Sequence, residues 1–268
     1  FLGPVITRTL VERVGIANLM LVSAGLLSVC MVCILRLRHW AVLRERERRL
    51  ASGEVPMGGE IMAGLKLIAR EPLLRWLAFM VVMAVGVGTL LYNEQNAIAR
   101  TAFVTADERA TFFATLDLAV NTLTLVIQVF ATRPLLSRYG IAPALLIPAA
   151  AIIIGYSILA ASPLPLMVAI VQVVTRAGEF SLAKPARETI YTRVGREWRY
   201  KAGAAIDTVV YRGGDLAFVW LHKLLSAFGS HVVFGGGLLV AGGMTFGAWR
   251  LLREEAKLPS ERAVAAAP

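Results

Sequence analysis

The longest uncharged run of the chain is "YGIAPALLIPAAAIIIGYSILAASPLPLMVAIVQVVT", residues 139–175. An α-helix rises ~1.5 Å per residue, so about 20 apolar residues cross the ~30 Å hydrocarbon core of a bilayer. The run is too long for one crossing, and "SPLP" at residues 162–165 interrupts it with two prolines, which disfavour a continuing helix. It therefore predicts two membrane-spanning helices joined by a short connection.

The rest of the chain repeats this pattern. Hydrophobic residues make up 57% of it and charged residues 17%, whereas a soluble domain has ~45–50% apolar and ~25% charged residues. The alternation typical of barrel strands is absent. We therefore expect an all-α integral membrane protein with seven spans. They are residues 14–35, 73–92, 110–132, 141–161, 164–181, 203–225 and 232–252.

The chain has a formal net charge of +10, and its basic residues are unevenly distributed along the sequence. Basic residues gather in every second connection, within 36–72, 133–138 and 184–201, and again in the tail, while the other connections carry few. This alternation follows the positive-inside rule, which predicts cytoplasmic basic loops and a cytoplasmic C-terminus. The expected partner of these charges is the lipid bilayer rather than a nucleic acid polymer.

The order of the segments predicts a half-bundle. We divide the chain into 1–35, the end of one helix and the last helix of a preceding half-bundle; 36–72, a cytoplasmic linker; 73–252, a six-helix transmembrane half-bundle; and 253–268, a cytoplasmic tail. This layout resembles the second half of a major facilitator, whose two six-helix halves hold the substrate between them. We expect upstream sequence to supply the missing N-terminal half-bundle as a partner.

Motifs for enzymatic or metal chemistry are missing. The sequence has no GxxxxGK[ST] phosphate loop and no HExxH zinc motif. The histidines His39, His222 and His231 do not cluster at ligand spacing. Cys30 and Cys33 form a CxxC inside a charge-free helix, where free cysteine acts as a small hydrophobe. We expect no enzyme, no cofactor and no metal.

One pair of glycines and one set of four polar residues stand out within the spans. Gly243 and Gly247 form a GxxxG, which we interpret as a helix-packing surface. In the third span, four polar residues share one helical face because of their spacing. That face either lines a cavity or forms interhelical hydrogen bonds. The four residues are Asp117, Asn121, Thr124 and Gln128.

The sixth span, inside "REWRYKAGAAIDTVVYRGGD" at residues 196–215, carries three charges in an otherwise apolar run. Arg212 and Asp215 stand three residues apart, so we expect them to pair and to lower each other's cost in the membrane. Asp207 lies at the edge of their face. The arrangement serves either a transport pathway or a structural ion pair. The broad polar face consists of Thr208, Tyr211, Arg212, Asp215 and His222.

The end of the fifth span is also charged. Glu179, Lys184 and Arg187 lie near its cytoplasmic end, together with Arg176 and Glu188. They could meet an anionic substrate at the cytoplasmic mouth, although ordinary positive-inside charge explains them better on physical grounds alone.

The run "AKPARETIYTRVGREWRYKAGAAIDTVVYRGGD" resembles the bacterial branch of the non-mitochondrial ATP/ADP carriers, a family related to the major facilitators, as does "LYNEQNAIARTAF". The resemblance covers most of residues 59–255 and implies nucleotide exchange by alternating access. It also implies Arg187, Lys201 and Arg212 as cationic contacts. One departure is Asp215, which stands where the best-known exchangers often have a lysine, and an acid cannot attract a phosphate.

Two hypotheses follow. The first is a secondary transporter that exchanges a nucleotide or another small organic anion; the second is a membrane scaffold or sensor that keeps the transporter fold. They differ over whether the polar faces serve flux or only folding. The candidate transport-pathway residues are Asp117, Asn121, Gln128, Glu179, Lys184, Arg187, Lys201, Asp207, Tyr211, Arg212 and Asp215.

Overall fold

A computed structural model describes residues 2–52, 61–192, 194 and 198–257 of the 268-residue chain. Within these residues the chain forms helices and short connections, and no strand. Six of the described helices are long and apolar enough to cross a membrane. The prediction of an all-α, membrane-type protein is confirmed at this level.

The chain divides into two compact units, residues 1–59 with 105–115, and residues 60–104 with 116–268. The first unit contains α1 (Leu2–Ser52). This helix breaks at Gly15, whose φ of 78° and ψ of 161° leave the helical region and favour glycine. Its apolar part, Asn18–Arg38, contains no buried residue and overlaps the predicted first span. Cys30 and Cys33 are exposed and unbonded here.

The predicted 36–72 linker contains more helix than expected. Helix α1 continues from the apolar part to Ser52 instead of ending near residue 35. A separate helix, α2 (Ile61–Arg70), then precedes the next span. Residues 53–60 of the predicted linker lie outside the described residues.

The helices of the second unit follow each other closely. The prolines near residue 163 act as predicted, because one helix ends at Ala161 and the next begins at Pro165. Gly229, with a φ of 95°, allows the turn before the last helix. The elements are α3 (Pro72–Ala102), α4 (Ala106–Ile127), η1 (Gln128–Thr132), α5 (Arg133–Tyr139), α6 (Ile141–Ala161), α7 (Pro165–Gly178), η2 (Glu179–Ala183), α8 (Lys184–Thr192), η3 (Trp198–Ala202), α9 (Gly203–Ala205), η4 (Ile206–Val210), α10 (Tyr211–Ser226) and α11 (Ser230–Glu255). Helix α4 belongs to this unit only from residue 116 onward, because residues 106–115 fall in the first unit.

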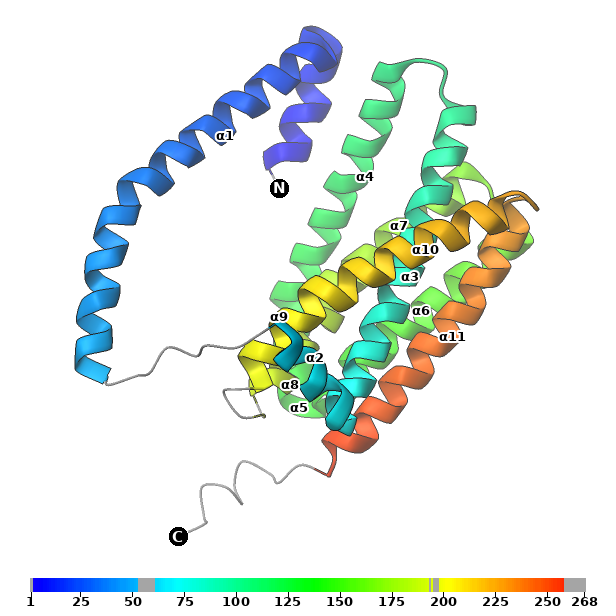
Figure 1. Ribbon diagram of the computed structural model, residues 1–268. Helices are drawn as coiled ribbons and strands as arrows, with labels where there is room; N and C mark the ends of the chain where they lie inside the picture. The colour runs from blue at the N-terminus through cyan, green and yellow to red at the C-terminus, as the bar shows by residue number, and fades with distance from the viewer. Residues whose placement is uncertain (1, 53–60, 193, 195–197, 258–268) are drawn as a thin grey trace. The chain divides into compact units, whose positions relative to one another are not determined.

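Helix α3 forms the centre of this unit, because it packs against α7, α10 and α11, and α11 also packs against α6 (Figure 1). Its core side chains Leu74, Leu77 and Leu90 are fully buried. The GxxxG prediction is confirmed at this interface. A Cβ atom added to Gly247 would lie 2.9 Å from the ring of Phe79, so only glycine lets α11 approach α3 this closely.

The predicted sixth span, at 203–225, does not meet the length and composition criterion. The backbone is helical from η3 through α10, as expected. The charges of Asp207, Arg212 and Asp215 fall within residues 203–220, so this segment is less apolar than the other spans. The predicted helix is confirmed, and its crossing of a membrane stays a prediction.

Four short π-helical segments, η1 to η4, interrupt the described helices of the second unit. A π turn holds one residue more than an α turn, and such segments often occur at functional sites. Segment η2 follows α7, and η4 precedes α10. They therefore lie in the two helical stretches that carry most of the predicted site residues.

Candidate functional site

A cavity of about 750 Å³ lies inside the second unit. Residues of α3 line it, with residues of the α7–η2–α8 stretch and of the η4–α10 stretch, and Ile152 and Met244 add apolar surface. Both interrupted stretches thus turn toward the same space. The charged lining residues are Arg176, Glu179, Lys184, Arg187, Glu188, Asp207, Arg212 and Asp215.

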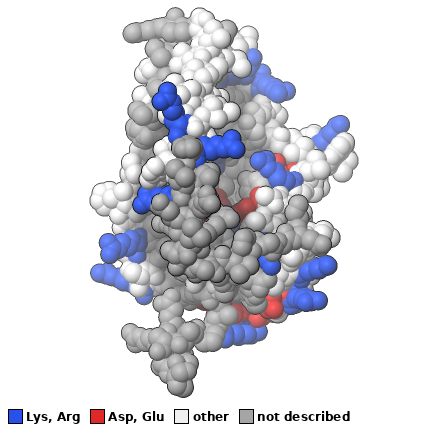
Figure 2. Space-filling model, turned by 60° about the vertical axis from the view of Figure 1, so that its left-hand side comes forward, with Lys and Arg blue, Asp and Glu red and all other residues white. Residues whose placement is uncertain are grey.

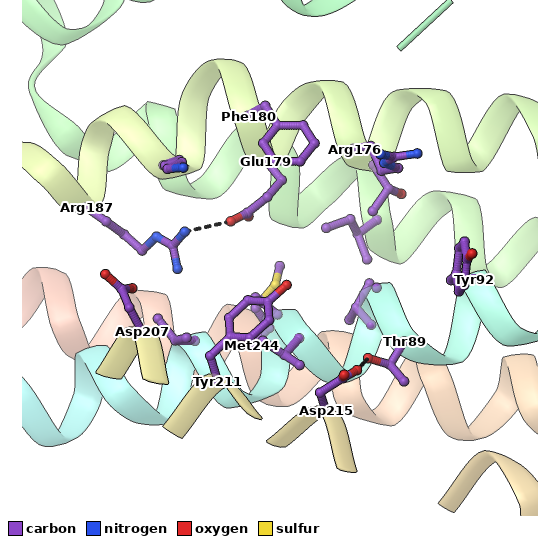
Figure 3. A pocket seen from close by; sticks show the side chains of 18 of the residues that line it. Thr89, Tyr92, Arg176, Glu179, Phe180, Arg187, Asp207, Tyr211, Asp215 and Met244 are labelled. Carbon is purple, nitrogen blue, oxygen red and sulfur yellow. Dashed lines mark hydrogen bonds and ion pairs between the residues drawn. The ribbon is translucent and has the colours of Figure 1, made fainter. Parts of the chain in front are cut away.

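One wall of the cavity belongs to the α7–η2–α8 stretch. Arg187 Nη2 donates a hydrogen bond to Glu179 Oε1 at 2.9 Å, so this ion pair joins α8 to the start of η2 (Figure 3). Arg176 Nη1 donates to Asp117 Oδ1 of α4 at 2.6 Å. Both arginines of this wall are therefore already neutralised by carboxylates of the protein.

The opposite wall carries Asp207, Tyr211 and Asp215 in a row (Figure 3). Asp215 Oδ1 accepts a hydrogen bond from Thr89 Oγ1 of α3 at 2.7 Å. The expected ion pair between Arg212 and Asp215 is absent from the described contacts, so that prediction is wrong. Gly214 of α10 packs beside Val82 of α3, where an added Cβ atom would lie 3.7 Å from Val82 Cα, an ordinary contact distance.

Several charged lining residues have no partner. Within the described part of the chain, Lys184, Arg212, Asp207 and Glu188 form no hydrogen bond or ion pair. The lining contains four basic and four acidic side chains, so its formal charges sum to zero. The charges on the molecular face in Figure 2 are not balanced in this way, because Lys and Arg predominate over Asp and Glu there. The cavity is thus charged without the basic excess of the chain.

The structure brings seven of the eleven predicted site residues together. The other four lie elsewhere and do not line the cavity. Asp117 binds Arg176, Gln128 Nε2 donates to the carbonyl of Phe180 at 3.2 Å, and Asn121 is half-buried. Lys201 lies on η3. The seven are Glu179, Lys184, Arg187, Asp207, Tyr211, Arg212 and Asp215.

The polar face of the third predicted span contacts a neighbouring helical stretch and does not line the cavity. Asp117 and Gln128 both reach residues of the α7–η2 stretch, as does Thr132, whose hydroxyl donates to the carbonyl of Ser181 at 2.8 Å. Of the two alternatives that the sequence left open, these contacts favour interhelical hydrogen bonding.

Two polar groups of the cavity lining were missed. Thr89, Tyr92 and Asn93 stand at i, i+3 and i+4 of α3, and Gln172 and Thr175 stand at the same spacing with Arg176, which the sequence analysis had named, on α7. This spacing places each group on one helical face and could have revealed them. Gln172 is 3% exposed, and its Oε1 has no hydrogen-bond partner among the described residues.

A second buried polar contact lies outside the cavity lining. His222 Nε2 of α10 lies 2.9 Å from Glu94 Oε2 of α3, and the two side chains are 15% and 5% exposed. His222 was placed on the polar face by its spacing, but Glu94 lies beyond the predicted end of the second span. No group of three or more potential metal ligands occurs among the described residues.

Comparisons of the chain with protein families, with curated proteins and with solved structures found no match. The geometry of the cavity therefore provides the functional argument.

Proposed function

We propose that this chain is part of a secondary transporter of the major-facilitator type, which moves a small charged organic solute across a membrane by alternating access. In this proposal the 73–252 region is one six-helix half-bundle, and a second half-bundle of the same protein faces it across the substrate. The proposed location is a bacterial cytoplasmic membrane.

The observation that carries the proposal is the charged lining of the cavity. A charged side chain near the centre of a membrane helix costs on the order of 2.5–3.5 kcal/mol on insertion scales. Asp207 and Arg212 lie within the predicted sixth span, and packing alone gives no reason to turn their unpaired charges toward one space. The volume of about 750 Å³ lies within the range of roughly 300–1,000 Å³ that is usual for small-molecule sites.

The family resemblance supports transport and implies a nucleotide or another organic anion as substrate. Two of its three implied cationic contacts, Arg187 and Arg212, line the cavity, and Lys201 does not. Of these two, Arg187 is engaged by Glu179. Nucleotide exchange is therefore one arm of the test.

The test is counter-exchange in proteoliposomes that contain the protein in its full encoded length. The labelled solutes are ATP, ADP, a dicarboxylate and a panel of amino acids and amino phosphates. Lys184→Gln removes an unpaired lining charge, and Lys66→Gln on α2 is its control, because Lys66 is exposed and lies outside the cavity. We expect Lys184→Gln to reduce the exchange of at least one solute and Lys66→Gln to leave it unchanged.

The scaffold hypothesis predicts a different outcome. A scaffold needs its buried polar residues only for folding, so no solute would exchange, and the two lysine variants would differ at most in thermal stability. That result would refute the transporter proposal.

A further inference from the structure

We infer that the substrate is a small zwitterion, a molecule with one ammonium group and one carboxylate or phosphate group a few ångströms apart. The inference rests on the proposed function, because it names the substrate class of the same cavity. It starts from Arg212 and Asp215, two opposite charges that line the cavity from one helix.

These two residues are neighbours that do not pair. Side chains three residues apart on a helix have Cβ atoms about 5–6 Å from each other, so an arginine and an aspartate at this spacing can form an ion pair. Here Asp215 accepts the hydroxyl of Thr89, and Arg212 has no partner within the described residues. The two opposite charges therefore remain available one helical turn apart.

Each residue retains the binding capacity that one end of a zwitterion requires. The guanidinium of Arg212 presents donors in a planar fork that fits a carboxylate or a phosphate. The carboxylate of Asp215 uses one acceptor site for Thr89 and keeps others for an ammonium group. Thr89 also holds this carboxylate in place, so it is oriented before a substrate arrives.

The charge balance of the whole lining supports the same substrate class. The lining has four basic and four acidic side chains, and Arg176 and Arg187 already bind carboxylates of the protein. A nucleoside triphosphate would bring several negative charges beside Asp207 and Asp215. The lining has no excess of basic side chains to offset the repulsion between the phosphates and these carboxylates. A zwitterion adds no net charge and satisfies both signs.

Two sources share this chemistry. One is a free solute such as an amino acid or 2-aminoethyl phosphate, and the other is the ammonium–phosphate headgroup of a lipid. Separate arms distinguish them: labelled alanine and 2-aminoethyl phosphate test the free solutes, and labelled lysophosphatidylethanolamine tests the lipid. ATP, ADP and succinate provide the arm without a positive group.

The experiment uses proteoliposomes with the full encoded chain. We expect exchange of at least one zwitterion, and a decrease of about 10- to 100-fold for Arg212→Gln and for Asp215→Asn, because each removes a charged hydrogen-bonding partner. The double variant with Arg212→Asp and Asp215→Arg keeps both charges in reversed order and should exceed either single variant. Lys223→Gln, on the same helix but outside the lining, is the control.

The elution profile and thermal midpoint of each variant in detergent show whether it is folded. The conservative variant Arg212→Lys keeps the positive charge and should retain more exchange than Arg212→Gln. Exchange of ATP, ADP or succinate without any zwitterion would overturn the inference and leave the transporter proposal standing. Zwitterion exchange that is unaffected by the Arg212 and Asp215 variants would also overturn it, because the site would then be wrong. Absence of all exchange would refute both proposals.

Discussion

Gly237→Ala perturbs a point at which three helices of the second unit meet. A Cβ atom added to Gly237 of α11 would fall on the ring of Tyr156 in α6. Tyr156 is fully buried, and its hydroxyl donates a hydrogen bond to the carbonyl of Val87 in α3 at 2.5 Å. The ring is therefore held from two sides and has no free direction in which to move.

The expected cost combines two contributions. Forcing a methyl group into a packed core costs about 1–3 kcal/mol. A shift of the ring also breaks or strains the hydrogen bond of a buried hydroxyl, which costs about 1–3 kcal/mol. Alanine offsets part of this, since it is better than glycine inside a helix by about 1 kcal/mol. We expect Gly237→Ala to lower the free energy of unfolding by about 1–5 kcal/mol, with about 3 kcal/mol as the central value.

The assay is reversible unfolding of the purified protein in detergent, monitored by helical circular dichroism and tryptophan fluorescence. Gly242→Ala is the matched control, because Gly242 lies on the same helix and a Cβ atom there meets nothing within 4 Å. The control should be neutral or slightly stabilising. If the two variants were equally stable, Gly237 would not pack closely against Tyr156, and the expected loss of stability would be refuted.

Two further predictions concern buried polar groups. Replacing His222 by Leu leaves the buried Glu94 carboxylate without its partner, so we expect a double-mutant cycle with Glu94→Gln to give a coupling of about 0.5–3 kcal/mol in the free energy of unfolding; additive effects would show that the two side chains do not interact. Gln172→Leu removes an unpartnered buried carbonyl, so the free energy of unfolding should stay the same or rise by up to about 1 kcal/mol while solute exchange falls; a loss of stability above about 2 kcal/mol would instead reveal a protein partner for Gln172.

Helix positions were predictable because their causes are local. The uncharged run at residues 139–175 and its prolines place a helix end at Ala161 and a helix start at Pro165, and the structure has both. The row of Asp207, Tyr211 and Asp215 also follows from helical spacing alone. Each of these predictions depends on neighbours within a few turns of the same chain segment.

Partners of the polar residues were not predictable in the same way. Spacing suggested that Asp215 binds Arg212, but its partner is Thr89, which is 126 residues distant in sequence. Asp117 likewise reaches Arg176 on another helix instead of lining the cavity. These contacts depend on how separate helices pack against each other, which the spacing of residues along one helix does not reveal.

The π-helical segments beside the cavity have a mechanical consequence. Segments η2 and η4 each end where a helical stretch begins that carries lining charges, Lys184 and Arg187 after η2 and Arg212 and Asp215 after η4. Because a π turn contains an extra residue, moving it one position along the helix rotates the residue that it passes by about 100° about the axis. Such a migration would turn individual side chains toward or away from the cavity while both ends of the helix stay in place.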